Sequence, residues 1–332
     1  MSSTLLDHHD VVLLDLDGTV YRGGELVPHA LESIQRVHGA DVPVRYVTNN
    51  ASKPDQAVVD HLIGLGLDAE RSEVSTSAQA GAAVLAEKLP AGSRVLVTGS
   101  PALESEVDAL GLVPVHAFAD EPVAVVQGLF NELTYGDFAE ACLAIRDGAL
   151  WVACNADRTL PTERGLLPGN GSLVELLRAA TDQDPVVAGK PERPLLDRAV
   201  SSAGGSRPLM VGDRLDTDIA GAVKAGMPSL MVLTGVNTPR DLLEAIPAER
   251  ADHVSVDLRG LHAPASEVAI AEQPAWSVTV GSRLELSALG GGDEFGALRA
   301  LCAAWWKAGS GPVEVVGTDD AARDALRALE ID

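Results

Sequence analysis

Two aspartates with one residue between them follow a short apolar segment near the start of the chain. Residues Val11 to Leu14 predict a buried strand, and Asp15 and Asp17 come directly after it, with Gly18 allowing a sharp turn. In such a pair, one carboxylate can attack a phosphoryl group while the other protonates the leaving alkoxide and later deprotonates water. Asp15 is therefore a candidate nucleophile and Asp17 a candidate acid and base; two solvated acids in a surface loop are the alternative.

A second apolar segment, Val42 to Val47, ends in a hydroxyl and two amides, Thr48, Asn49 and Asn50. At the end of a strand, these side chains can form hydrogen bonds with phosphoryl oxygens. Because Thr and Asn also begin helices frequently, a helix start at Thr48 or Asn50 is the alternative.

A third polar segment follows the apolar residues Leu209 to Val211 and contains three acids, Asp213, Asp216 and Asp218. Such a concentration of carboxylates is costly through mutual repulsion unless a cation is bound. Mg²⁺ prefers one or two carboxylates together with waters and a substrate phosphate. We expect Asp213 to bind Mg²⁺ directly, and Asp216 and Asp218 to support the site from behind the direct ligands.

Lysine is scarce in this chain, which makes the position of Lys190 informative. It stands between Gly189 and Pro191, where the backbone is restrained. Its ammonium could neutralise charge on a nucleophile and on a transferring phosphoryl group. A solvated surface lysine is the alternative.

Strand-like and helix-like segments alternate along the chain around these polar residues. Strand-like segments near Val95, Val123, Trp151 and Leu230 are each followed by amphipathic stretches, which predicts an α/β fold with helices on both faces of a parallel sheet. The chemically capable segments lie at the start and again between residues 187 and 218. We therefore predict an inserted α/β unit at residues 78–183, between two parts of a core at 1–77 and 184–260.

The last part of the chain predicts a small α/β tail. Residues 261–274 have little apolar periodicity and predict a linker. In the tail, residues 275–332, Trp276 to Leu289 alternates like a pair of strands, and the following segments predict a helix, a strand and a second helix. The glycines Gly290 to Gly292 before Asp293 predict a loop in which Asp293 caps the next helix.

Composition excludes several classes of function. The net charge of −23 disfavours nucleic acid and anionic lipid as partners, and it requires local cations in any site for a phosphate ester. The three cysteines are far apart and are expected to be buried thiols. No membrane span or signal segment is recognised, so a cytoplasmic location is expected.

In this order, the segments DLDGT, TNN, GKP and GDRLDTD resemble the four motifs of the haloacid dehalogenase superfamily. The resemblance implies a doubly wound, Rossmann-like core and a Mg²⁺-dependent phosphatase with Asp15 as nucleophile. It also implies that Asp17 is the acid and base and binds Mg²⁺ through its main-chain carbonyl, and that Asp15 and Asp213 are metal ligands. Thr48 and Lys190 are implied to stabilise the phosphoryl group. Gly18, Asn49 and Asn50 are expected in the phosphate-binding set.

The predicted insertion looks like the larger α/β cap of the para-nitrophenyl phosphatase branch of that family, in which the cap supplies specificity. Within it, Asn155 to Thr162 and Gly169 to Ser172 resemble the cap segment near the substrate, and Arg158 is the candidate contact, with an exposed turn as the alternative.

Bacterial glycerol 3-phosphate phosphatases of this branch carry a tail that looks like a partial acetyltransferase domain. The resemblance thus favours glycerol 3-phosphate, with phosphoglycolate, pyridoxal phosphate or sugar phosphates as alternatives. An acetyl-CoA-dependent transferase or a ligand-binding protein is the alternative of another class, and the oligomeric state stays open, with a homodimer as one option.

Overall fold

The computed structural model describes residues 3–162 and 164–331 of the chain. The chain divides into two compact units, Met1–Arg45 with Ala203–Asp332, and Tyr46–Ser202. The domain boundaries at residues 77 and 184, drawn from the spacing of the polar segments along the sequence, remain predictions. Within the described ranges, every helix is too short or too polar to span a lipid bilayer.

The first unit contains a parallel sheet in which the strands lie in the order β15, β14, β13 and β1. Its strands are β1 (Val11–Leu14), β13 (Pro208–Gly212), β14 (Ser229–Val232) and β15 (His253–Ser255), with a small antiparallel pair β2 (Tyr21–Arg22) and β3 (Glu25–Leu26). Its helices and turns are η1 (Leu6–His8), α1 (Ala30–Gly39), η4 (Leu215–Ile219), α8 (Ala220–Ala225), α9 (Pro239–Leu243), η5 (Pro247–Glu249), η6 (Leu258–His262) and α10 (Ala265–Val268).

Helical segments cover both faces of this sheet, as the alternating sequence predicted. Met231 packs in an apolar cluster with Leu215 of η4 and Leu242 of α9. The preceding residue, Leu230, faces the other way and lies against Gly260 of η6. Because both faces are buried, the strands can be apolar throughout, and all four residues of β1 are fully buried.

The second unit contains a five-stranded parallel sheet with the order β12, β9, β8, β6 and β7. Its strands are β6 (Arg94–Thr98), β7 (Val113–Val115), β8 (Ala124–Gln127), β9 (Leu150–Ala153) and β12 (Val186–Val187), with the hairpin β10 (Thr159–Thr162) and β11 (Gly165–Pro168). Strand β4 (Val44–Thr48), which crosses the division between the units, is parallel to β5 (Val74–Thr76). The helices and turns are α2 (Asp55–Gly64), η2 (Arg71–Glu73), α3 (Ser77–Lys88), α4 (Pro101–Ala109), η3 (Phe118–Asp120), α5 (Tyr135–Arg146), α6 (Asn170–Thr181) and α7 (Arg193–Ala203).

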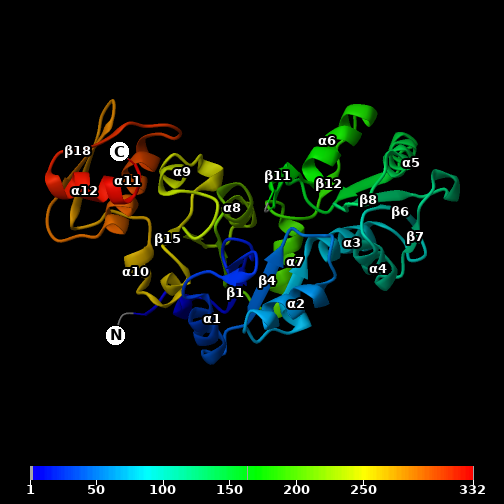
Figure 1. The fold of residues 1–332 in the computed structure, drawn as a ribbon, viewed down its shortest axis with the longest axis horizontal. Helices are drawn as coiled ribbons and strands as arrows, with labels where there is room; N and C mark the ends of the chain where they lie inside the picture. The colour runs from blue at the N-terminus through cyan, green and yellow to red at the C-terminus, as the bar shows by residue number, and fades with distance from the viewer. Residues whose placement is uncertain (1–2, 163, 332) are drawn as a thin grey trace. The chain divides into compact units, whose positions relative to one another are not determined.

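Alternate residues of strand β8 face two separate apolar layers, because successive side chains of a strand point to opposite faces. Val126 packs with Leu103 of α4 in a cluster that includes the apolar face of α3. Val125 packs with Phe138 of α5 and Leu177 of α6. Figure 1 shows α3 and α4 on one face of this sheet and α5 and α6 on the other.

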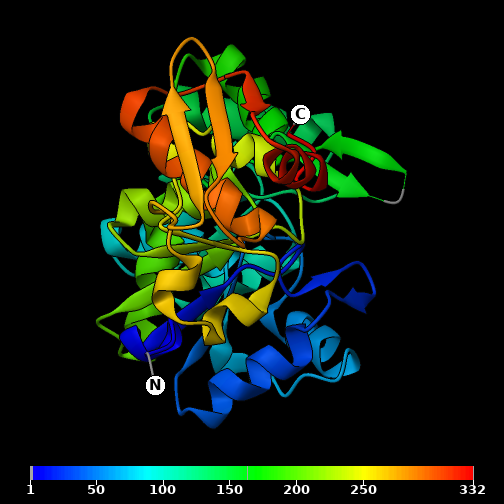
Figure 2. The ribbon, with the colours of Figure 1, turned by 90° about the vertical axis from the view of Figure 1, so that its left-hand side faces the viewer.

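The tail forms a three-stranded sheet with two helices and belongs to the first unit. It consists of β16 (Trp276–Val280), β17 (Leu284–Ala288), α11 (Glu294–Ala308), β18 (Val315–Gly317) and α12 (Asp320–Ala328). Figure 2 shows β16 and β17 as a long hairpin, drawn in light orange, with β17 also parallel to β18. The predicted strand pair, helix, strand and helix are confirmed. The prediction that Asp293 caps the helix after the glycines is also confirmed, because Asp293 Oδ1 accepts a hydrogen bond from Gly296 N at 2.6 Å.

Two details differ from the sequence-based expectations. The sequence predicts one Pro-containing helix over Pro239 to Glu249, but α9 ends at Leu243, because Pro247 lacks an N–H and disfavours a helical residue before it. Of the three cysteines expected to be buried, Cys154 and Cys302 are, whereas Cys142 is only partly covered.

Candidate active site

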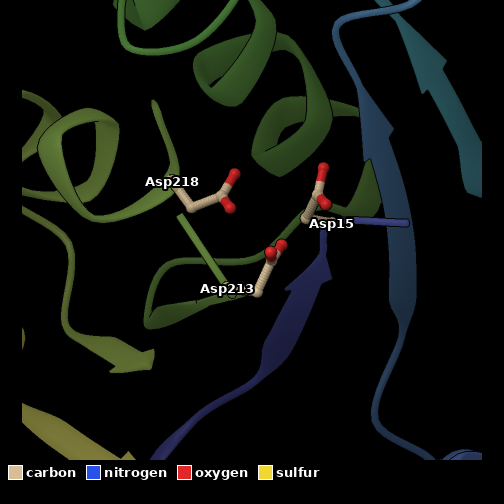
Figure 3. A group of neighbouring side chains, drawn as sticks. All are labelled: Asp15, Asp213 and Asp218. Atoms are coloured by element: carbon tan, nitrogen blue, oxygen red, sulfur yellow. The ribbon is translucent and has the colours of Figure 1, made fainter. Parts of the chain in front are cut away.

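The carboxylates of Asp15, Asp213 and Asp218 converge in the first unit. Each offers an oxygen atom, and these atoms all lie within 4.8 Å of one another. Figure 3 shows the three side chains close to one another, with Asp15 at the tip of β1. Asp213 and Asp218 are fully buried, and Asp15 is partly buried.

The parallel pairing of β1 and β13 brings two of these acids together. Leu14 is opposite Val211, and Asp15 N donates a hydrogen bond to Val211 O at 2.9 Å. The carboxyl ends of both strands therefore lie at the same edge of the sheet, where α/β sites form. Asp213 follows Gly212, the last residue of β13, so it emerges beside Asp15.

Asp218 reaches the same place from the turn η4. Its Oδ2 accepts a hydrogen bond from Arg214 N at 3.1 Å. A Cβ atom placed at Gly212 would lie 2.3 Å from the Asp218 side chain. Glycine at 212 is thus needed for Asp218 to fold back against the strand end.

The chemistry of these donors fits a hard divalent cation. Three carboxylates at this spacing repel one another, and two of them have no contact with solvent to screen the repulsion. Carboxylate oxygens with room for water and phosphate are the ligands that Mg²⁺ prefers. The cluster contains Asp15 and Asp213, as expected. It also contains Asp218, which we expected behind the direct ligands.

Asp17 and Asp216 do not contribute side chains to this cluster of described residues. Asp17 is exposed, and its backbone forms a bridge with Tyr21. The Asp216 carboxylate pairs with Arg214 at 2.8 Å, and its side chain is 59% exposed. An exposed ion pair of this kind gives Asp216 a local partner away from the three converging carboxylates.

Tyr21, which no sequence pattern singled out, lies beside the aspartate pair. Gly18 N donates to Tyr21 O at 2.7 Å, which folds the chain back after the DLDG segment. Burial, and then the charges of Asp17 and Asp15, raise the pKa of the Tyr21 phenol. The phenol therefore remains a neutral hydrogen-bond donor at pH 7. Its place in the segment next to Asp17 was the signal available from the sequence.

In the second unit, Asn49 joins the end of β4 to Lys190. Asn49 Oδ1 accepts from Lys190 N at 2.8 Å, and Asn49 Nδ2 donates to Lys190 O at 2.9 Å. The Lys190 side chain is only 2% exposed, and its Nζ donates to Val47 O at 3.0 Å. Thr48 is buried at the strand end, and its Oγ1 accepts from Asn50 N at 3.2 Å. Lys190 is therefore held inside the protein rather than solvated.

Asn49 also joins this strand end to the segment Asn155–Asp157. Its Nδ2 lies 3.1 Å from Asp157 Oδ1, and its carbonyl accepts from Asn155 Nδ2 at 2.6 Å. Ser77 Oγ donates to the same carbonyl at 2.6 Å. The contacts of Asn155, Asp157 and Ser77 with Asn49 were not expected, because they join residues far apart in the chain.

Arg158 is exposed and lines a surface depression of the second unit. Together with Glu175 and Arg178 it lines an open depression of about 310 Å³ on the second unit. Arg178 there pairs with Glu175 at 2.7 Å and with Asp184 at 2.5 Å. A role for Arg158 in contacting substrate remains a prediction.

Three family models match the chain. The haloacid dehalogenase-like hydrolase model matches residues 12–113, and a HAD-hydrolase-like model matches residues 187–261. A GCN5-related N-acetyltransferase like domain matches residues 273–331. The acidic cluster and Lys190 lie within the first two matches.

Curated relatives and solved structures agree with these models. The D-glycerol 3-phosphate phosphatase of Mycobacterium tuberculosis is 46% identical over 98% of this chain and 95% of its own length. The crystal structure of a glycerol phosphate phosphatase from Mycobacterium tuberculosis in complex with magnesium is 46% identical, has a TM-score of 0.95 and covers 100% of both chains. A 5'-nucleotidase of Bacillus subtilis is 40% identical over 68% of this chain and 87% of its own. The 4-nitrophenylphosphatase of Thermotoga maritima is 32% identical with a TM-score of 0.73, covering 78% of this chain and 98% of that one.

Proposed function

Because the chain belongs to the haloacid dehalogenase-like hydrolases, we propose that it is a Mg²⁺-dependent phosphatase that hydrolyses glycerol 3-phosphate to glycerol and phosphate. The observation that carries the reaction class is the convergence of Asp15, Asp213 and Asp218 at the carboxyl ends of adjacent parallel strands. The observation that carries the substrate is the full-length similarity to a glycerol 3-phosphate phosphatase.

Asp15 and Asp17 divide the chemistry in this proposal. An Asp15 oxygen attacks phosphorus while the ester P–O bond breaks, and the glycerol oxygen takes the electron pair of that bond together with the proton of Asp17. A water molecule then attacks the phosphorus of the aspartyl phosphate, Asp17 takes a proton from the water, and the bond to Asp15 breaks. The exposure of Asp17 supports its exchange of protons with substrate and water.

Asp15, Asp213 and the main-chain carbonyl of Asp17 would hold the metal, and Asp218 is placed to assist them. When bound, Mg²⁺ supplies positive charge that stabilises the phosphoryl oxygens. The protein must supply further positive charge, because its net charge of −23 repels an anionic ester.

Thr48 and Lys190 are proposed to stabilise the phosphoryl group, with Gly18, Asn49 and Asn50 in the surrounding set. The burial of Lys190 and its fixed hydrogen bonds support this role, since a desolvated ammonium interacts strongly with anions. Asn49 would then act by fixing the Lys190 backbone at both its N–H and its carbonyl.

The choice among phosphate esters depends on how much of the chain each relative covers. The nucleotidase and the acid sugar phosphatases match about 70% of this chain, whereas the glycerol 3-phosphate phosphatase matches 98%, including the tail. The tail matches an acetyltransferase-like family model, but the start of its first helix does not favour an anionic coenzyme. The N-terminus of α11, the part of a helix that attracts phosphates, is capped by the Asp293 carboxylate.

Steady-state kinetics test the substrate. We expect kcat/KM for glycerol 3-phosphate to exceed that for phosphoglycolate, pyridoxal phosphate, glucose 6-phosphate and a nucleoside 5'-monophosphate by at least about tenfold, or about 1.4 kcal/mol. Each ester is measured at saturating Mg²⁺, and the Asp15→Asn variant serves as the blank for contaminating phosphatases. A higher kcat/KM for any other ester would reject glycerol 3-phosphate while leaving the reaction class intact.

A further inference from the structure

The loop between β14 and α9, residues 233–238, contacts the DLDG turn. Thr234 Oγ1 donates a hydrogen bond to Gly18 O at 2.6 Å. The two residues are 216 positions apart, so this contact ties the strand end of β14 to the turn after β1. The loop therefore reaches the catalytic edge of the sheet, although none of its side chains belongs to the acidic cluster.

The same loop holds the carboxylate of Asp213. Val236 N donates to Asp213 Oδ2 at 2.7 Å, and Thr19 Oγ1 donates to Asp213 Oδ1 at 3.3 Å. Both oxygens of this fully buried side chain thus accept a hydrogen bond within the first unit. Two donors on opposite oxygens fix the plane of the carboxylate as well as its position.

Gly235 and Asn237 bring the loop close enough for this contact. A Cβ atom at Gly235 would lie 1.8 Å from Asp213 Oδ2, so any side chain there would displace the carboxylate or the loop. Asn237 Oδ1 accepts from Leu215 N at 2.9 Å, and Asn237 N lies 3.4 Å from Asp213 O. Asn237 therefore fixes the loop to the chain on the far side of Asp213.

We propose that Thr234, Gly235 and Asn237 are positioning residues that set the affinity of the acidic cluster for Mg²⁺ by fixing the Asp213 carboxylate. This inference rests on the proposed metal-dependent function. Mg²⁺ demands near-ideal octahedral geometry, so the cost of a misdirected ligand is high. Residues that orient metal ligands typically change metal affinity by about 10- to 100-fold when they are replaced.

The test uses Thr234→Val, which keeps the size of the side chain and removes the hydroxyl. We expect its dissociation constant for Mg²⁺, measured by calorimetry on the intact chain, to rise about tenfold. The Mg²⁺ concentration at half-maximal phosphatase activity should rise in parallel, while KM for glycerol 3-phosphate at saturating Mg²⁺ changes less than about twofold. Thr234→Ser, which restores the hydroxyl, should bind Mg²⁺ like the wild type.

The neighbouring Thr238→Val is the matched control, because Thr238 caps α9 through Asp241 N and does not touch Asp213. It should lower the melting temperature without changing Mg²⁺ affinity. Gly235→Ala, if folded, should weaken Mg²⁺ binding more than Thr234→Val. Unchanged Mg²⁺ binding by folded Thr234→Val, or equal weakening by Thr238→Val, overturns the inference. A wild-type protein that binds Mg²⁺ but releases no phosphate contradicts the proposed function instead, and calorimetry still decides the role of the loop.

Discussion

Asp17 is proposed to act in both steps of the reaction, as the acid for the leaving group and as the base for water. A carboxylate nucleophile alone can form a covalent intermediate, but an alkoxide leaving group also requires a proton. The structure leaves the Asp17 side chain exposed while its backbone bridges to Tyr21. Its position is therefore fixed by the backbone, and its carboxylate is available for proton transfer.

Replacing Asp17 by Asn should affect esters according to their leaving group. Loss of the acid should slow glycerol 3-phosphate hydrolysis by about 10²- to 10⁴-fold. With 4-nitrophenyl phosphate, whose leaving group needs no proton, Asp15 should still be phosphorylated, but the aspartyl phosphate should accumulate. Rapid-mixing experiments should then show a burst of about one nitrophenolate per protein chain. Equal slowing of both esters without a burst would contradict the acid and base role of Asp17.

Local sequence was enough to find the acids that follow strands, but not the residues that orient them. Asp15 and Asp213 stand immediately beyond apolar runs, so a strand prediction places them at a sheet edge. Thr234 and Val236 act on Gly18 and Asp213 through contacts that only the folded sheet creates. No local pattern carries that information.

The tail docks through Arg250 on the segment that contains α9 and η5. Its guanidinium donates to Trp306 O at 2.9 Å and to Gly309 O at 2.5 Å, and it stacks 5.4 Å from the Trp306 ring centre. Trp306 Nε1 donates in return to Leu243 O at 3.1 Å. These contacts border one apolar cluster that contains residues of η4, α9, α11 and α12.

Arg250→Ala should lower the free energy of unfolding by about 2 to 4 kcal/mol, because two charge-assisted hydrogen bonds and one cation–π contact are lost. Chemical denaturation followed by circular dichroism measures this change. Arg283→Ala is the control, since Arg283 forms an exposed ion pair with Glu285 in the β16–β17 hairpin. It should cost at most about 1 kcal/mol. Equal effects of the two variants would show that the Arg250 contact does not hold the tail.

The elements were predictable where periodicity was strong and less so where the chain turns. The alternation of Trp276 to Leu289 predicted the tail hairpin correctly. The segment after Leu243 has apolar residues at helical spacing, but Pro247 ends the helix early and η5 replaces its last turns. The cap segment Asn155–Asp157 could be recognised only by resemblance, because its contacts with Asn49 join distant residues.

Three histidines, one buried and two partly buried, couple the stability of the whole molecule to pH. Burial lowers the pKa values of His9, His253 and His262. The backbone carbonyl Ser229 O, which contacts His253 Nδ1 at 3.0 Å, and the charge of Asp252 partly oppose this shift for His253. With folded-state pKa values below the unfolded value of about 6.5, the unfolded chain binds more protons in the window between the two.

The free energy of unfolding should therefore fall as the pH drops below about 6.5, and continue to fall until the pH reaches the folded-state pKa values. His253→Asn keeps an amide donor near Ser229 O and removes one titrating group. The difference in melting temperature between pH 7.5 and pH 5.5 should be smaller in this variant than in the wild type. His116→Asn, at an exposed position, should leave the difference unchanged. If the difference in melting temperature is the same in His253→Asn as in the wild type, His253 does not contribute to the pH dependence of stability.

The proposed reaction depends on covalent attack on phosphorus by Asp15 with Mg²⁺ held beside it, and Asp15→Asn removes the attacking carboxylate. The measurement is phosphate release from glycerol 3-phosphate by wild type and variant, each at saturating Mg²⁺ and with the metal removed by a chelator. We predict that Asp15→Asn retains its melting temperature within a few degrees but loses at least about 10³-fold in kcat, and that chelation abolishes wild-type turnover. Turnover by folded Asp15→Asn at the wild-type rate would contradict the account.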